Sequence, residues 1–216
     1  MRIVAMSDLH GHLPADVPAA DLVIIAGDVC PDVPGSALPS HRRSAGIRQA
    51  DWLRESFAPW AEGLRADATI MCWGNHDFAG ELPPDRLPPL PVEIVTDRAV
   101  RVAGVSLYAT PWTFTVPEVW AFDVEPDELA GYMDAIPTGI DILVTHGPPF
   151  GVLDRVASGH HVGSRALAAA SARVRPQLHV FGHIHEARGR EGTSCNVSVV
   201  DEHYRPYALP LTVLEL

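Results

Sequence analysis

Five short apolar runs recur along this 216-residue chain, and a polar motif follows each of them. Short continuous apolar runs are typical of strands that are buried on both faces of a sheet. If these strands lie side by side, their carboxyl ends meet at one edge, which is where α/β proteins bind ligands. The runs are residues 3–6, 22–26, 69–73, 140–144 and 178–181, and the motifs are Asp8-Leu9-His10, Gly27-Asp28, Gly74-Asn75-His76-Asp77, His146-Gly147-Pro148-Pro149 and Gly182-His183-Ile184-His185.

The side chains in these motifs have the chemistry of metal ligands. Asp8 and His10 lie two residues apart, so their side chains share one side of extended backbone, and the last motif repeats this spacing. Carboxylate, imidazole and amide groups without cysteine suit manganese, iron or zinc, rather than an all-thiolate structural zinc. Asp28 is the expected shared ligand of two ions, because a carboxylate offers two oxygens and a histidine only one free nitrogen. The candidates are too many for one tetrahedral ion and comprise Asp8, His10, Asp28, Asn75, His146, His183 and His185.

Each motif taken alone has a simpler explanation that involves no metal. The Gly-Asp pair could be a turn, and Asn75 and Asp77 could bond to nearby backbone in a strand-to-helix turn. His146 could be a loop histidine, and the last motif could be a half-exposed strand end. Five such coincidences at five successive strand ends favour the metal site over these explanations.

The ordered motifs resemble the calcineurin-like metallophosphoesterase superfamily from residue 3 to about residue 200. A narrower resemblance is to the small metallophosphoesterase-domain-containing phosphodiesterases. It rests on Thr110-Pro111-Trp112, Trp120-Ala121-Phe122 and the stretches 141–149 and 178–186. The resemblance implies an α/β fold, a four-layer α/β/β/α sandwich of two mixed sheets flanked by helices. We expect residues 1–216 to form a single domain of this kind.

The resemblance also implies a role for each motif residue. Asp8, His10 and His185 would hold one divalent ion, Asn75, His146 and His183 would hold the second, and Asp28 would bridge them. His76 would face the leaving group, and Asp77 would orient or polarise His76. The implied reaction is hydrolysis of a phosphodiester by a hydroxide that bridges two ions of Mn²⁺, Fe²⁺/Fe³⁺ or Zn²⁺.

Two other functions stay open on the sequence. A phosphomonoesterase acting on a small metabolite, nucleotide or phosphoprotein would use the same metals. A non-catalytic protein-binding scaffold is disfavoured because all seven ligands and His76 are retained. Asp123, Val124 and Glu125 stand where the narrower group carries a neutral Asn and a basic Arg, so the substrate preference of that group does not carry over directly.

Composition narrows the partners and the location. The net charge of −11 argues against binding long nucleic acid and favours a small phosphorylated substrate, possibly a nucleotide. No apolar stretch is long enough to span a bilayer, and Met1 precedes the first strand too closely for a signal peptide. Three widely spaced cysteines, Cys30, Cys72 and Cys195, favour a reducing cytoplasm over disulfides.

The segments between the motifs predict helices and a few further strands. Apolar spacing predicts a helix from Ile47 through Phe57 that is interrupted near Pro59. A second helix should begin at Pro126 and bury Leu129, Met133 and Ile136, and a third should begin at the cap Ser164 and run through Leu167 towards Val174. The remaining predictions are a hairpin over 101–109 around Gly104 and closing strands of the second sheet at 196–200 and 211–216.

Three residues are the candidates for substrate contact. Trp112, with Phe114, Trp120 and Phe122, could stack on a base or sugar, although packing of this loop onto the domain is favoured for at least two of the four. His161 could touch phosphate at the start of the helix after Ser164, or belong to a plain surface loop. His12 lies beside the first motif as either a substrate contact or a bystander.

Overall fold

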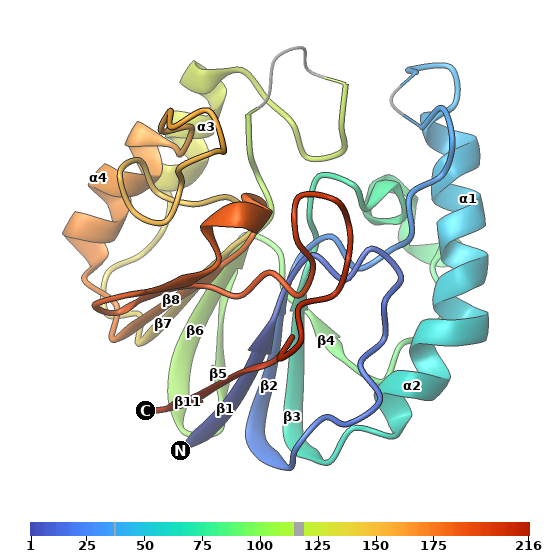
Figure 1. Ribbon diagram of the computed structural model, residues 1–216, viewed down its shortest axis with the longest axis horizontal. Coiled ribbons are helices and arrows are strands. Elements are labelled where there is room, and N and C mark those ends of the chain that lie inside the picture. The colour runs from blue at the N-terminus through green and yellow to red at the C-terminus, as the bar shows by residue number, and fades with distance from the viewer. Residues whose placement is uncertain (37, 115–118) are drawn as a thin grey trace.

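The computed structural model describes residues 1–36, 38–114 and 119–216. Its strands form two mixed sheets (Figure 1). The first has the order β11-β1-β2-β3-β4, and only β11 is antiparallel to its neighbour; the second has the order β5-β6-β7-β8-β10-β9, with antiparallel strands at both edges. The bounds are β1 Arg2–Met6, β2 Ala20–Ala26, β3 Ala66–Cys72, β4 Glu93–Ile94, β5 Arg98–Val102, β6 Val105–Thr110, β7 Ile142–Thr145, β8 Leu178–Phe181, β9 Gly189–Glu191, β10 Ser194–Asn196 and β11 Thr212–Glu215.

Helices cover the outer face of each sheet. Helices α1 (Arg42–Trp52) and α2 (Ala58–Glu62) lie beside the first sheet, and α3 (Pro126–Asp134) and α4 (Arg165–Val174) lie beside the second (Figure 1). Among the described residues, no helix combines the length and the apolar character that crossing a bilayer requires. Short 3₁₀ turns at Phe78–Glu81, Pro84–Arg86 and His185–Ala187 complete the helical elements.

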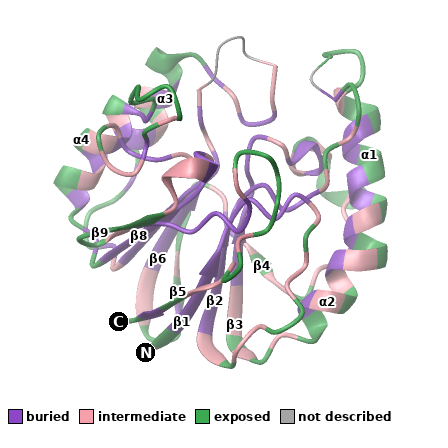
Figure 2. Ribbon diagram, in the orientation of Figure 1, coloured by how far each residue is buried: buried purple, intermediate pink, exposed green. Residues whose placement is uncertain are grey.

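Three apolar clusters fill the three interfaces between these four layers. Along β1, Val4 and Met6 face the cluster under α1, whereas Ile3 and Ala5 face the cluster between the sheets. Both faces of the strand are therefore buried, which is why its sequence is a continuous apolar run. Figure 2 shows this burial along the strands. Met6 and Phe57 belong to the first cluster, Ile24 and Val144 to the second, and Leu143 and Leu167 to the third. Each cluster thus contains residues from two adjacent layers, and the predicted four-layer sandwich is confirmed.

The predicted helices are present, with one difference of extent. The Ser164 hydroxyl accepts a hydrogen bond of 3.1 Å from the Leu167 N–H at the start of α4, and Pro126 occupies the first turn of α3. The first helix begins earlier than predicted and continues past Pro59 to Glu62. Pro59 lacks the N–H that an α-helix requires at this position. A π-helical turn over Leu53–Phe57 precedes Pro59 and accommodates the missing hydrogen bond.

The hairpin of β5 and β6 is confirmed, but one predicted closing strand lies in the other sheet. Strand β11 pairs with β1 in the first sheet, with Arg2 opposite Glu215. The reason is the path of the chain after β10, where Ser198 pairs with Ser7 and brings the chain across to the free edge of β1. Strand β10 does close on β8 in the second sheet, but it spans Ser194–Asn196 and ends where the predicted strand 196–200 was to begin.

Candidate metal centre

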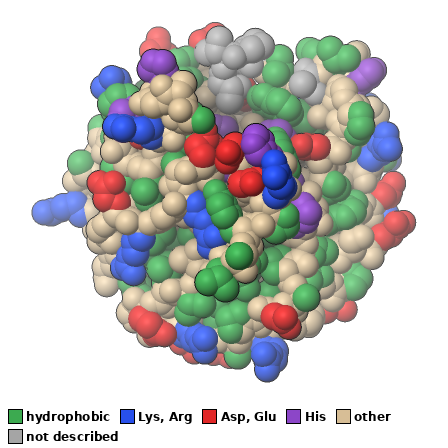
Figure 3. All heavy atoms as spheres, viewed as in Figure 1, with side chains coloured by type: hydrophobic (Ala, Val, Ile, Leu, Met, Phe, Trp, Pro, Cys, Tyr) green, Lys and Arg blue, Asp and Glu red, His purple; other side chains and the backbone are tan. Residues whose placement is uncertain are grey.

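The carboxyl ends of β1, β2, β3, β7 and β8 converge where the two sheets touch. The Ser7 N–H donates to the Val197 carbonyl at 3.1 Å, and the Val199 N–H donates to the Ser7 carbonyl at 2.9 Å, which joins the sheets at this edge. Figure 3 shows acidic and histidine side chains gathered together on this face of the molecule. The sequence prediction that the polar motifs meet at one edge is therefore correct.

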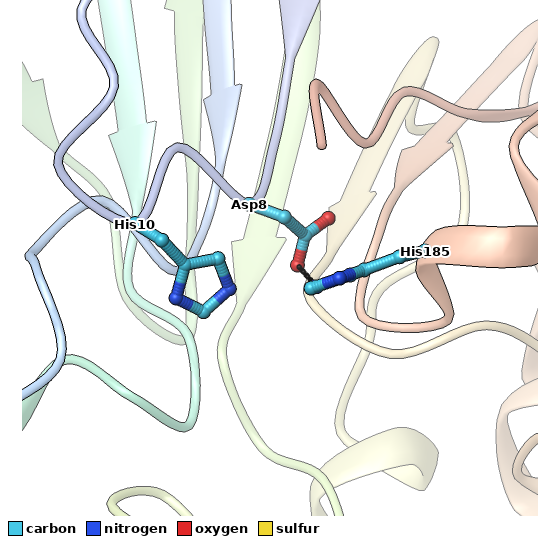
Figure 4. Close-up of side chains that lie close together, drawn as sticks. All are labelled: Asp8, His10 and His185. Atoms are coloured by element: carbon cyan, nitrogen blue, oxygen red, sulfur yellow. Dashed lines mark ion pairs between the residues drawn. The ribbon is translucent and has the colours of Figure 1, made fainter. Parts of the chain in front are cut away.

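The first group of ligands contains Asp8, His10 and His185. Ligand atoms of these three residues all lie within 4.8 Å of one another. The Asp8 carboxylate and the His185 ring point toward each other, with Oδ1 and Nε2 3.4 Å apart, and the His10 ring enters from the loop after β1 (Figure 4). The arrangement matches a three-residue cation site.

The second group contains Asn75, His146 and His183. Oδ1 of Asn75 lies 2.8 Å from Nε2 of His146 and 2.9 Å from Nδ1 of His183. Oδ2 of Asp28 lies 3.2 Å from the same His146 nitrogen and 3.7 Å from Nε2 of His10, which belongs to the first group. Asp28 therefore stands between the groups, the position that a bridging carboxylate requires.

Hydrogen bonds outside the cluster orient the ligand rings. Nδ1 of His146 donates to the Ala26 carbonyl, and Nδ1 of His185 donates to the Asp201 carbonyl, each at 3.0 Å. Because a carbonyl only accepts, these contacts assign the proton to Nδ1 and leave the Nε2 lone pair facing the cluster. Asp8 is held in turn by the Ser198 hydroxyl, which donates to it at 2.6 Å.

The side chain of His10 tests whether the cluster fits a cation. Both ring nitrogens of His10 are buried and have no hydrogen-bond partner among the described residues. A buried polar atom without a partner costs about 1–3 kcal/mol, so such atoms in native proteins call for an explanation. A metal ion bound by the single lone pair of the ring would supply a partner for one of the two nitrogens. The donor set of imidazole, carboxylate and amide oxygen fits a divalent transition metal.

The electrostatics of the cluster also call for positive charge. Burial raises the pKa of Asp28, but the charges of His146 and His76 outweigh it and hold that pKa well below its usual range. Burial lowers the pKa of His146, yet Asp28 and Asp8 raise it to about 9. Burial and the charge of His146 lower the pKa of His183 to about 3, so this ring stays neutral and keeps a lone pair free. Protons on the histidines compensate the buried carboxylates here, and divalent ions would do so more directly.

The backbone of the motifs is strained in ways that the ligand positions require. Asp8, His10, Asp28 and His183 have φ values of 55°, 42°, 52° and 68°, in the left-handed region that non-glycine residues rarely adopt. A Cβ at Gly74 would lie 2.3 Å from both the backbone nitrogen and Oδ1 of Asp28. Gly74 therefore allows the loops after β2 and β3 to approach each other closely.

His76 lies at the mouth of the cluster, and its carboxylate partner is not the one predicted. Its Nδ1 lies 2.6 Å from Oδ1 of Asp32, and its ring stacks on Trp120 with 4.1 Å between the ring centroids. The Asp77 carboxylate instead accepts hydrogen bonds from the backbone N–H groups of Val29, Cys30 and Gly74. The expectation that Asp77 orients His76 is corrected, because Asp77 turns inward to hold the two loops together while His76 turns outward.

Two residues that the motifs did not identify belong to this part of the site. Asp32 lies in the loop after Asp28, and the repeated acidic residue in that loop is a signal that could have been used. Tyr204 packs edge-on against His10, with 4.6 Å between the centroids, and no pattern in the sequence points to it. Trp120 was one of four aromatic candidates, and it is the one that contacts His76.

The structure separates the three candidates for substrate contact. Trp112 donates from Nε1 to Asp97 at 2.7 Å and stacks on Tyr132, which fits the packing explanation, although it also lines a small hollow beside His183. His161 pairs with Asp154 in its own loop, and it lines a hollow together with Ser164 and Arg165 at the start of α4. His12 is exposed, and no contact links its side chain to the cluster within the described parts of the chain.

Comparison with known proteins agrees with this geometry. Residues 1–187 match the calcineurin-like phosphoesterase family. The chain is 32% identical over 245 residues to metallophosphoesterase domain-containing protein 1 of Homo sapiens, covering 98% of this chain and 70% of the human protein, and equally similar to the Mus musculus protein of that name. A solved structure of a Thermus thermophilus protein shares the fold, with a TM-score of 0.52 and 16% identity over 93% of this chain and 89% of that one. The chain belongs to the calcineurin-like phosphoesterase family, which acts on phosphoric esters.

Proposed function

We propose that this protein is a dinuclear-metal phosphoesterase that hydrolyses phosphodiesters. The observation that carries the proposal is the position of the Asp28 carboxylate, whose Oδ2 faces His146 of one ligand group and His10 of the other. The unpartnered ring of His10 supports it, because a bound cation would give a partner to one of its two nitrogens. Family membership supports the reaction class.

We assign the ligands as two sets that share one residue. Asp28 would be shared by two divalent ions of manganese, iron or zinc, and the metal that is bound depends on availability as much as on these donors. When bound, the ions supply an activated water and neutralise charge on the phosphoryl oxygens. The first ion takes Asp8, His10 and His185, and the second takes Asn75, His146 and His183.

The protein's own acid in this proposal is His76. Asp32 holds the Nδ1 side of the ring, which leaves Nε2 to donate a proton to the departing ester oxygen. Trp120 stacks on the ring and keeps water from one of its faces. Acid assistance of this kind typically contributes about 10²–10⁴-fold to a rate.

A diester fits the charge at the mouth of the site better than a monoester. The Asp32 side chain is 45% exposed there, and among the described residues its ion pairs are with histidines, not with lysine or arginine. A dianionic monoester would meet stronger repulsion from this carboxylate than a monoanionic diester would. A phosphomonoesterase stays the alternative, and a protein-binding scaffold is a more remote one.

The test is a metal-reconstituted assay with matched substrates. The protein, stripped and reloaded with Mn²⁺, is offered bis(4-nitrophenyl) phosphate and 4-nitrophenyl phosphate. We expect hydrolysis of the diester with little monoesterase activity, and none in an Asp8→Asn variant. The exposed Asp51→Asn change serves as the matched control, since Asp51 pairs only with Arg54 on the surface described here.

The outcomes separate the candidate functions. A reversed preference would replace the diesterase with a monoesterase. Absence of turnover with manganese, iron and zinc, despite stoichiometric binding, would favour the scaffold. We also propose that the substrate is a small phosphorylated molecule, which the acidic net charge of the chain supports. A reducing cytoplasm is the proposed location, and three free, buried cysteines support it. We also propose that residues 1–216 act as one domain.

A further inference from the structure

A tight turn near the carboxyl terminus leans over the first ligand group. The Asp201 carbonyl accepts the hydrogen bond of His185, and the Asp201 carboxylate accepts from the backbone N–H groups of His203 and Arg205, each at 2.9 Å. In Figure 1 the loop that contains this turn is drawn in dark red in front of the ends of the first-sheet strands. A ligand residue and this turn are therefore one connected unit.

Tyr204 is the residue that this turn presents to the cluster. Its ring meets the ring of His10 edge-on with 4.6 Å between centroids, and the ring of His185 with 5.4 Å between centroids. The residue is 41% exposed, so part of the ring touches the ligands and the rest faces solvent. Its φ of 61° lies in the left-handed region, which a bulky residue adopts only at a cost in free energy.

The turn does not need Tyr204 to hold it in place. Tyr207 donates from its hydroxyl to the His185 carbonyl at 3.1 Å, and the Arg188 guanidinium lies 4.8 Å from the centroid of the Tyr207 ring. Together with the Asp201 bonds, these contacts anchor both ends of the turn. By contrast, no hydrogen bond to the Tyr204 hydroxyl occurs among the residues that the structure describes.

The Tyr204 hydroxyl stays a neutral hydrogen-bond donor. A tyrosine hydroxyl ordinarily has a pKa of about 10, so it carries its proton at neutral pH. The contacts of its ring with His10 and His185 place the phenol over the first ligand group. A donor that lacks a partner among the described residues, beside a site for an anion, has the position of a ligand contact.

We propose that Tyr204 is a substrate-binding residue whose hydroxyl donates a hydrogen bond to a phosphoryl oxygen of the ester. The inference rests on the proposed function, because that function places the phosphoryl group over the two ligand groups. It adds a contact that is supplied by the carboxyl-terminal turn and not by any of the five strand-end motifs.

The test measures binding of inorganic phosphate to the manganese-loaded protein by titration calorimetry. Tyr204→Phe removes only the hydroxyl, and we expect about tenfold weaker phosphate binding with unchanged manganese content by elemental analysis. The value of kcat/KM for the diester should fall by a similar factor. Tyr132→Phe is the matched control, since that ring stacks on Trp112 and its hydroxyl makes no hydrogen bond within the described chain.

Three other outcomes would overturn the inference. Unchanged phosphate affinity in Tyr204→Phe would show that the hydroxyl does not touch the anion. Loss of manganese in that variant would show that Tyr204 acts on the cations instead. Absence of phosphate binding by the loaded wild-type protein would overturn it as well. If the wild-type protein binds phosphate through Tyr204 but hydrolyses no ester, the proposed function fails and this inference stands.

Discussion

The Nδ1 atom of His76 lies 2.6 Å from Oδ1 of Asp32, across two loops that are 44 residues apart in the sequence. Burial alone would lower the pKa of His76, but the charge of Asp28 and the bond with Asp32 raise it above its usual value. Burial likewise raises the pKa of Asp32, and its ion pairs with His10 and His76 more than reverse that effect. The pair therefore favours a protonated imidazole beside an ionised carboxylate.

Removing the carboxylate of this pair should weaken the acid. In Asp32→Asn we expect kcat for the diester to fall by about tenfold or more. A general acid works only while protonated, so activity declines as pH rises through its pKa, and the lower His76 pKa in the variant should move that decline to lower pH. The pH–rate profile measures this. An unchanged alkaline limb would contradict the pairing.

Removing the ring itself should separate catalysis from metal binding. In His76→Ala the backbone N–H at this position can still donate to Asp28, as it does at 2.7 Å in the wild type. We expect turnover to fall by about 10²–10⁴-fold while manganese content stays constant. The loss should be smaller for a 4-nitrophenolate leaving group, which needs little protonation. Metal loss by elemental analysis would contradict the assigned role.

Removing the bridge should empty both cation sites. Asp28→Ala deletes the carboxylate shared between His10 and His146, so we expect loss of both ions and of activity. Metal content after dialysis is the measurement, and the exposed Asp51→Asn change should retain both ions. An active Asp28→Ala variant that keeps two ions would refute the bridging assignment.

The motif glycine should tolerate no side chain. Gly74→Ala would place a Cβ 2.3 Å from the backbone nitrogen of Asp28, and we expect about 1–3 kcal/mol lower free energy of unfolding together with weaker metal binding. Gly131→Ala is the control, because no described atom would contact that Cβ within 4 Å in helix α3. It should stabilise the protein by about 0.5–1 kcal/mol. Equal effects in chemical denaturation would contradict the steric argument.

A histidine away from the cluster should make stability depend on pH. His179 is 1% exposed, and burial lowers its pKa to about 3. The unfolded chain binds a proton at this residue below about pH 6.5 and the native protein does not, so stability is lost as pH falls from 6.5 towards 3.

Denaturant unfolding of the chelated protein at several pH values measures this effect. From pH 6.5 to pH 5 the wild-type protein should lose about 2 kcal/mol through His179. His179→Gln should lose that much less over the same interval, because glutamine does not titrate and can still bond to Thr145. Parallel profiles for the two proteins would show that the buried ring is not the cause.

The five strand ends were predictable from the local sequence. A strand that is buried on both faces of its sheet requires a continuous apolar run, and the candidate ligands follow directly after each run. The seven ligand candidates and the helix starts at Pro126 and Ser164 followed from the same kind of local constraint, whereas the four layers were implied by the family resemblance. Strand β11 was misplaced because nothing in its own residues says which sheet edge is free. That depends on where the chain goes after Ser198.

The residues that surround His76 could not be predicted from the local sequence. Asp77 is its neighbour in sequence, but the Asp77 carboxylate accepts from the Gly74 backbone, and the carboxylate that bonds to the His76 ring comes from Asp32 in another loop. Tyr204 reaches His10 from the far end of the chain through a turn that no motif marks. A local sequence pattern predicts the interactions that a residue makes within its own strand or helix. Contacts between loops form only when the packed sheets bring those loops together.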